Sequence, residues 1–355
     1  MITYNSENAL IFNVPYQYGC TLPSLKDVQS YSFGGYGTGI STFGVQQGAQ
    51  GSQSPGIFIK TAPDTWGILL GDEFQPQIYR GQNQDFPSFK SSYDRLDGEE
   101  NKILALSQRE EFRKVFVQTP YYTRCRNFSV YDCKYEFDFE AIFQHYGFKS
   151  SYIDITKELM VALFFAYTYT ENGSYYPVHD FSKYNPTLYI SYISEIQKNA
   201  NVHPISLQMV KRPVTQMAMA INTNENDLKV YFEKYELPKN PMIAIDIYEK
   251  FRHGEALFPR EPISDIANQI LVTKELNEDV VKKVCHENSV CFEDVKREFE
   301  SRDYVFSNIE WQINEDMRLW MNSDIDEKWL LFLEQISRRR CSPIANINKG
   351  IQQKI

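Results

Sequence analysis

Residues 137–170 read FDFEAIFQHYGFKSSYIDITKELMVALFFAYTYT and contain the clearest structural pattern in the chain. The segment 137–147 predicts a helix that ends at Gly147, a residue typical of the position after a helix terminus. A second helix is expected over 157–170, with Thr156 as its N-cap, and its apolar residues lie on all sides, so it must be buried on most of them. Between the two, SYIDIT (151–156) reads as a strand.

Three further runs read as strands. They are the start of IYRGQNQDFP (78–87), TLYISYI (187–193) and MIAIDIY (242–248), the last two bounded by proline. After the first of them, Gly81 reads as the start of a flexible run over 81–84. The segment 208–221 cannot form one regular helix, because Pro213 interrupts it. We therefore predict an α+β fold: a mixed, mostly antiparallel sheet around these strands, packed by the helices at 137–147 and 157–170, with a helical C-terminal part.

Length and composition predict three regions. Residues 1–74 form an N-terminal extension, in which the stretch 33–56 holds 8 of the 17 glycines and reads as a loop. Residues 75–272 form the main domain, and residues 273–355 form a helical extension that ends in a basic tail.

Charge and cysteine usage restrict the function. Thirty-seven basic and 46 acidic residues give a net charge of −9, which disfavours a broadly basic nucleic-acid surface but leaves a local basic groove open. The six cysteines include no CxxC pair and no zinc-type spacing, so we expect reduced thiols and no metal. The N-terminus does not read as a secretory signal, and the longest apolar block (159–166) is too short to cross a bilayer. We therefore expect a cytoplasmic protein without a membrane partner.

Several short motifs follow one another in an order that resembles the FRG domain family. The family has an aromatic-Arg-Gly motif, then QHYG, Asp-x-Thr and an Ala-Leu-x-Phe-Ala helix, and the resemblance covers about residues 75 to 270. The matching segments are YRGQ at 79–82, QHYG at 144–147, IDIT at 153–156, ALFFA at 162–166, RPVTQMAMAI at 212–221 and ALFP at 256–259. Where the family has Thr-Arg, this chain has Ser150-Ser151. The resemblance implies a bacterial protein in phage defence or stress response, without implying a reaction.

The order of these motifs is also similar to that in ADP-ribosyltransferases, which use NAD as a substrate. That analogy implies catalytic roles for Arg80, His145 and Gln216. Because cleavage of the nicotinamide bond develops positive charge on the ribose, a negative or strongly hydrogen-bonding group must lie beside it. Glu255 is the alternative to Gln216 for that role. The expected substrate-binding residues are Tyr79, Gln82, Gln144, Tyr146, Ser151, Asp154 and Thr156.

Each central residue also has a structural interpretation. Arg80 could form a surface ion pair, His145 could cap a helix end, and Asp154 could cap a helix or pair with Arg80. We predict that Arg80 and His145 converge with Gln144, Tyr146 and Thr156 on one pocket.

Three function classes follow. The first is an ADP-ribosyltransferase or NAD glycohydrolase that needs no metal, with a protein or nucleic-acid target left open. The second is a non-catalytic module that binds a nucleotide or a phosphorylated partner. A nuclease comes third, because the sequence lacks an acidic metal cluster.

Overall fold

The protein is described by a computed structural model of the 355-residue chain. The structure describes residues 9–12, 56–62, 65–70, 77–126, 129–130, 133–134, 137–171, 173–196, 199–205, 209–222, 227–326 and 346–347. Most of the glycine-rich stretch at 33–56 and of the basic tail lies outside these residues.

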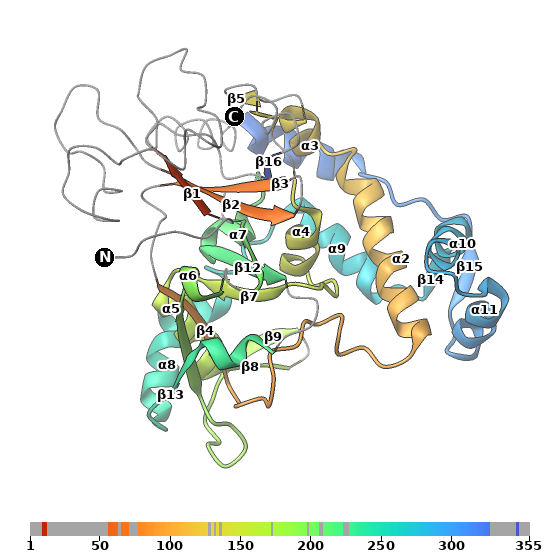
Figure 1. Cartoon of the computed structure of the whole chain (residues 1–355). Helices are drawn as coiled ribbons and strands as arrows, with labels where there is room; N and C mark the ends of the chain where they lie inside the picture. The colour runs from red at the N-terminus through yellow and green to blue at the C-terminus, as the bar shows by residue number, and fades with distance from the viewer. Residues whose placement is uncertain are drawn as a thin grey trace.

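A six-stranded sheet forms the centre of the described structure (Figure 1). Every pair of neighbouring strands is antiparallel. In spatial order the strands are β11 (Asn201–Pro204), β12 (Ala218–Asn222), β7 (Ile153–Thr156), β4 (Gln77–Gln82), β10 (Thr187–Tyr192) and β13 (Glu233–Glu236). Helices pack on this sheet, so the predicted α+β fold class is confirmed.

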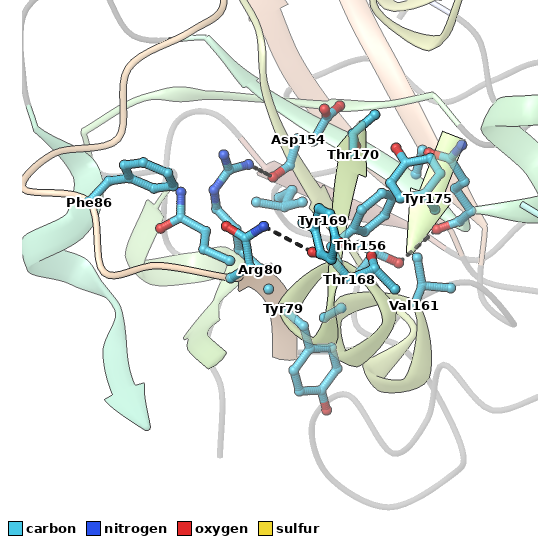
Figure 2. Close-up of a pocket in the computed structure, with 18 of the residues that line it drawn as sticks. Tyr79, Arg80, Phe86, Asp154, Thr156, Val161, Thr168, Tyr169, Thr170 and Tyr175 are labelled. Atoms are coloured by element: carbon cyan, nitrogen blue, oxygen red, sulfur yellow. Dashed lines mark hydrogen bonds between the residues drawn. The ribbon is translucent and has the colours of Figure 1, made fainter. Parts of the chain in front are cut away.

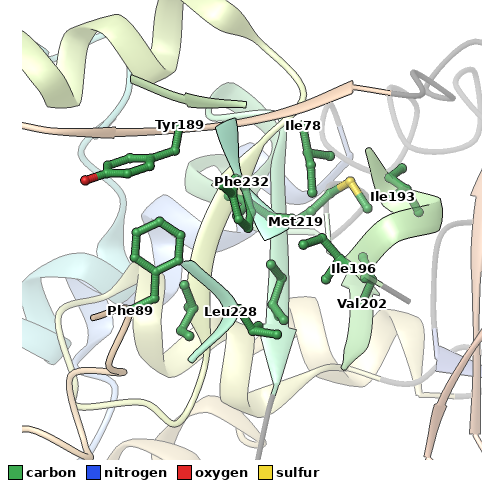
Figure 3. Packing of buried hydrophobic residues seen from close by; sticks show 12 residues of the cluster. Ile78, Phe89, Tyr189, Ile193, Ile196, Val202, Met219, Leu228 and Phe232 are labelled. Atoms are coloured by element: carbon green, nitrogen blue, oxygen red, sulfur yellow. The ribbon is translucent and has the colours of Figure 1, made fainter. Parts of the chain in front are cut away.

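One face of the sheet carries the main apolar core (Figure 3). Alternate residues of a strand point to the same face, so Ile78, Ile153 and Ile155 meet Met219 on this side. Helix α6 (Ile193–Ile196) and the 3-10 helix η2 (Leu228–Tyr231) cover the cluster. The remaining buried members are Phe89, Tyr189, Ile193, Ile196, Val202, Ile221, Leu228 and Phe232.

Helix α5 (Leu159–Tyr167) packs directly against β4. A Cβ atom added at Gly81 would overlap the carbonyl oxygen of Ala162 and lie 2.9 Å from the amide nitrogen of Ala166. Glycine is therefore required at this position by the close approach of two backbones. The sequence interpretation of Gly81 as the start of a flexible run was wrong, because β4 continues through Gln82.

The predicted bounds of this helix were also wrong. It begins after Glu158, whose side chain accepts a hydrogen bond from the Met160 amide, and Thr156 lies in β7. It ends at Tyr167, and the chain continues as strand β8 (Thr168–Glu171), which pairs with β9 (Ser174–Pro177). Threonine and tyrosine in TYT favour this extended backbone.

The segment MIAIDIY forms helix α8 (Pro241–Lys250), so the predicted strand at 242–248 was wrong. Asn240 caps the helix by accepting a hydrogen bond from the Met242 amide, and Pro241 occupies the first turn. Ala244 and Ile247 are buried against α5. This contact outweighs the strand propensity of the isoleucines.

Further helices lie beside the sheet. The long helix α2 (Glu99–Phe116) is followed by α3 (Pro120–Cys125) and by α4 (Phe139–His145). As predicted, Gly147 lies just after the end of α4, with a φ of 91°. Pro213 lies in the short helix α7 (Lys211–Thr215), which leads into β12. The 3-10 helix η3 (Arg252–Gly254) follows α8, and α9 (Pro262–Val272) packs on α2.

The C-terminal part is helical as predicted, with α10 (Glu278–Glu287), α11 (Phe292–Ser301) and a helical segment at 315–326. Two short parallel strands pair in this region: β14 (Glu275–Asn277) precedes α10, and β15 (Val305–Ser307) follows α11. A second sheet contains β1 (Ala9–Phe12), β2 (Gly56–Ala62), β3 (Thr65–Leu70) and β16 (Asn346–Ile347), and a small hairpin contains β5 (Ser129–Val130) and β6 (Cys133–Lys134). No helix among the described residues is both long and apolar enough to cross a membrane.

Candidate functional site

The candidate site lies where strands β4 and β7 separate. These strands share one residue pair, Tyr79 opposite Thr156, although both continue beyond it. A cavity of about 240 Å³ opens beside this pair, and we call it the main cavity (Figure 2). Its walls come from β4, β7, α5, β8 and the turn between α7 and β12. The gap in the sheet thus gives solvent access to side chains that a continuous sheet would cover.

Arg80 spans the gap between the two strands. Its Nη1 donates a hydrogen bond to the main-chain oxygen of Asp154, and its guanidinium lies 5.3 Å from the centroid of the Phe89 ring. Burial lowers the pKa of Arg80, while the charge of Asp154 opposes this shift. The hydrogen bond takes the place of a missing strand-to-strand bond, so Arg80 fixes the position of β7 at the cavity.

The carboxylate of Asp154 is exposed and forms no hydrogen bond or ion pair with the described residues. Figure 2 shows it directed away from the Arg80 guanidinium, which contacts only the main chain of Asp154. The expected Arg80–Asp154 ion pair is therefore absent from this part of the chain. Asp154 does not cap α5 either, because Glu158 does.

Asp154 lies where three cavities meet. Besides the main cavity it lines a larger one of about 690 Å³, which we call the wide lobe, and a third of about 200 Å³, which we call the basic pocket. The wide lobe extends toward α8, η3 and α9. One unpaired carboxylate is thus accessible from three sides.

His145 is the last residue of α4 and lines both the main cavity and the wide lobe. Its side chain is buried, and its Nε2 atom has no hydrogen-bond partner among the described residues. Burial lowers the pKa of His145, and the charge of Asp154 opposes this shift. The imidazole is therefore neutral near pH 7 and retains one ring nitrogen for an external partner.

Gln82 provides a second unsatisfied group. Gln82 is buried, as His145 is, and its Oε1 has no partner within the described ranges. Both residues line the main cavity. The buried Nε of Arg80, which lines the same cavity, also has no partner within the described ranges. Buried polar atoms are rarely left without a hydrogen bond, so three of them in one cavity indicate a place for a polar ligand.

The structure brings some of the other predicted residues to the same cavity. Tyr79, Thr156 and Gln216 line it together with Arg80 and His145. The Thr156 hydroxyl donates to the main-chain oxygen of Gln216 at 2.8 Å, and the Gln216 amide donates to the main-chain oxygen of Leu257 at 3.0 Å. These bonds hold the turn before β12 against β7. Glu255, the alternative to Gln216, lies on the wide lobe instead.

Three predicted residues lie elsewhere. Gln144 lines the wide lobe and the basic pocket but not the main cavity. Tyr146 is fully enclosed, and its hydroxyl donates to a Glu261 carboxylate oxygen at 2.5 Å. The Ser151 amide and hydroxyl both donate to Glu140, at 2.7 and 2.9 Å. Tyr146 and Ser151 thus satisfy hydrogen bonds inside the fold and line none of the three cavities.

Sequence reasoning missed the aromatic wall of the site. Phe165 and Tyr175 separate the main cavity from the wide lobe and line both, and Tyr169 extends the wall along β8. Burial raises the pKa of Tyr175 to about 12, so its hydroxyl stays protonated. Arg212 lines the wide lobe, donates to the main-chain oxygen of His145 at 3.2 Å and lies over the Tyr146 ring. Phe165 belongs to the ALFFA motif, whose apolar character indicated only core, whereas Tyr169 and Tyr175 lie outside the family motifs.

The described residues offer few candidates for a metal-binding site or for thiol chemistry. Within the described ranges, no group of three His, Cys, Asp or Glu side chains is placed to hold a metal ion. Three of the described cysteines are free: Cys125 and Cys285 are buried, and Cys291 is exposed.

The fold and cavities define an α+β protein with a candidate ligand site at a gap in an antiparallel sheet. Residues 75–174 match the model of the FRG domain family, so the chain contains an FRG domain. The match includes Arg80, His145 and Asp154, and it ends before Gln216 and most of the wide lobe. Comparisons with curated proteins and with solved structures gave no match.

Proposed function

We propose that this FRG domain binds NAD and cleaves the bond between nicotinamide and ribose, as an NAD glycohydrolase or ADP-ribosyltransferase. The observation that carries the proposal is the unpaired carboxylate of Asp154 at the junction of the three cavities. A carboxylate that forms no bond within the described fold is available to a ligand. Asp154 therefore takes the role that the sequence analogy gave to Gln216 or Glu255.

The chemistry needs a negative group where positive charge develops. When the bond between the anomeric carbon and the nicotinamide nitrogen breaks, its electron pair leaves with nicotinamide and the ribose becomes oxocarbenium-like. The Asp154 carboxylate stabilises that charge electrostatically. Gln216 cannot do so, because its amide is neutral and bonded to Leu257.

Other residues of the main cavity fit a nicotinamide ring. Phe165, Tyr169 and Tyr175 offer aromatic faces, which pack well against a planar heterocycle. The unpartnered Oε1 of Gln82 can accept a hydrogen bond from the carboxamide group of nicotinamide. Arg80 holds the main chain of Asp154 and so positions its carboxylate.

His145 completes the reaction as a proton acceptor. Water or an acceptor hydroxyl that attacks the oxocarbenium ion must lose a proton, and a neutral imidazole in the same cavity can take it. With water the products are ADP-ribose, nicotinamide and one proton. With another acceptor the product is an ADP-ribosylated target.

The test is nicotinamide release from NAD by the purified full chain, measured by chromatography. We expect turnover that depends on protein concentration. Saturable binding of ADP-ribose without nicotinamide release would contradict the enzymatic proposal and favour a non-catalytic nucleotide-binding module.

A second test uses Arg80. Arg80→Lys should lower turnover nearly as much as Arg80→Ala, because an ammonium group cannot reproduce the geometry of the guanidinium that holds Asp154. Full activity of the lysine variant would contradict this positioning role.

A further inference from the structure

The basic pocket differs in charge from the rest of the molecule. Its walls hold four cationic side chains and one acidic residue, Asp154, whereas the whole chain carries a net charge of −9. The cations are Arg80, Lys90, Arg95 and Lys149. Such a local excess of positive charge in an acidic protein favours an anionic ligand at this place.

Three of these cations have no partner within the fold. Lys90, Arg95 and Lys149 are exposed, and none forms an ion pair or a side-chain hydrogen bond within the described part of the chain. Arg95 lines the same pocket as Arg80, and its positive charge lowers the pKa of Arg80, because like charges repel. A bound anion would relieve this repulsion.

Two hydrogen bonds between Ser150 and the segment Ser92–Tyr93 hold together the two loops that carry these cations. The Tyr93 amide donates to the main-chain oxygen of Ser150 at 3.0 Å, and the Ser150 amide donates to the Ser92 hydroxyl at 2.9 Å. A turn closed by Ser91 and Asp94 precedes Arg95, with the Ser91 hydroxyl donating to the Asp94 carboxylate at 2.6 Å. Lys149 is thereby fixed beside the loop of Lys90 and Arg95, so the pocket is organised before any ligand binds.

The size of the pocket indicates which part of a ligand it takes. About 200 Å³ is below the roughly 300–1,000 Å³ of pockets that enclose a whole small molecule. The pocket shares Arg80, Arg95 and Asp154 with the main cavity, so a longer ligand can extend from one into the other. It therefore suits the charged part of a ligand whose remainder lies in the adjoining cavities.

We propose that the basic pocket binds the diphosphate group of a nucleotide, through Lys90, Arg95 and Lys149. A diphosphate brings several negative charges within a short length, which matches several cations around a small space. The identity of the nucleotide rests on the proposed function, whereas the binding of a phosphate group does not. Arg80 contributes charge here, while its hydrogen bond to Asp154 keeps it in the wall.

The experiment measures binding by calorimetry with ADP, inorganic pyrophosphate and adenosine as probes. We expect ADP and pyrophosphate to bind to the wild-type chain and adenosine to bind at least tenfold more weakly than ADP. Lys149→Gln should raise the Kd for ADP about tenfold, and the triple variant Lys90→Gln, Arg95→Gln, Lys149→Gln should abolish measurable binding. Lys250→Gln, an exposed lysine on α8 outside the three cavities, is the matched control and should leave the Kd unchanged.

Equal Kd values for ADP in the wild-type chain and the triple variant would overturn the proposal, as would equal binding of adenosine and ADP. Tighter binding of a 5′-phosphorylated oligonucleotide than of ADP would overturn the assignment to a nucleotide. If the variants weaken ADP binding but the wild type releases no nicotinamide, the diphosphate site stands and the proposed function fails. If NAD is cleaved and the triple variant binds ADP normally, the proposed function stands and the diphosphate site fails.

Discussion

Replacement of Gly81 by alanine tests the close approach of β4 and α5, on which the main cavity depends. The new Cβ atom would overlap the Ala162 carbonyl oxygen and lie 2.6 Å from its carbonyl carbon. The obstacle is helix backbone, which cannot rotate away as a side chain can. The carbonyl oxygen lies nearer to the new Cβ than the carbon does, so restoring an ordinary contact requires the helix to withdraw by more than about 1 Å. Overpacking typically costs about 1–3 kcal/mol, and we expect the upper end of this range here.

The assay is urea unfolding followed by circular dichroism, with Gly173→Ala as the control. Gly173 has a positive φ, of 78°, and an added Cβ there meets no atom within 4 Å. The control should therefore lose only about 1–2 kcal/mol of unfolding free energy, from backbone strain. If Gly81→Ala unfolds within about 0.5 kcal/mol of the wild type, the close-approach argument is refuted.

Three further predictions concern stability. Burial raises the pKa of Glu111 to about 7, so the folded chain holds this proton more tightly than the unfolded chain, and the free energy of unfolding falls as pH rises from about 4.5 to about 7. Glu111→Gln should flatten this fall, measured as the urea midpoint at each pH, and an unchanged fall would contradict the assignment. Tyr146→Phe removes a buried 2.5 Å hydrogen bond to Glu261 and should cost about 1.5–3 kcal/mol, seen as a lower Tm, whereas an unchanged Tm would count against that bond. Asn240→Ala removes the cap of α8 and should cost about 1 kcal/mol by urea unfolding; a cost near zero would mean that the cap contributes nothing.

The sequence predicted elements best where local pattern and tertiary packing agree. Gly147 ends α4 because only a positive φ allows the turn, and that requirement is local. The all-round apolar pattern of ALFFA correctly indicated a buried helix. MIAIDIY was misread because isoleucine favours strands, and the contact with α5 that makes it helical is not visible in a local window.

The candidate site was predictable only in part, for a geometric reason. The sequence placed Arg80 and Asp154 in two motifs of the same series, but it cannot tell whether a guanidinium reaches a carboxylate or a main-chain oxygen. The answer depends on where β4 and β7 separate. Lys90 and Lys149 lie outside the family motifs, and only their charge within an acidic chain could have indicated the basic pocket.

The most direct test of the central claim is nicotinamide release by Asp154→Asn in a single-turnover assay with NAD. Because the carboxylate is exposed and forms no bond within the described fold, the melting curve should stay unchanged. The cleavage rate should fall by about two to three orders of magnitude, since the amide keeps the shape but removes the charge. Glu255→Gln, which alters an exposed carboxylate of the wide lobe, is the control and should retain activity. An Asp154→Asn variant that cleaves NAD at the wild-type rate, with an unchanged melting curve, would contradict the account.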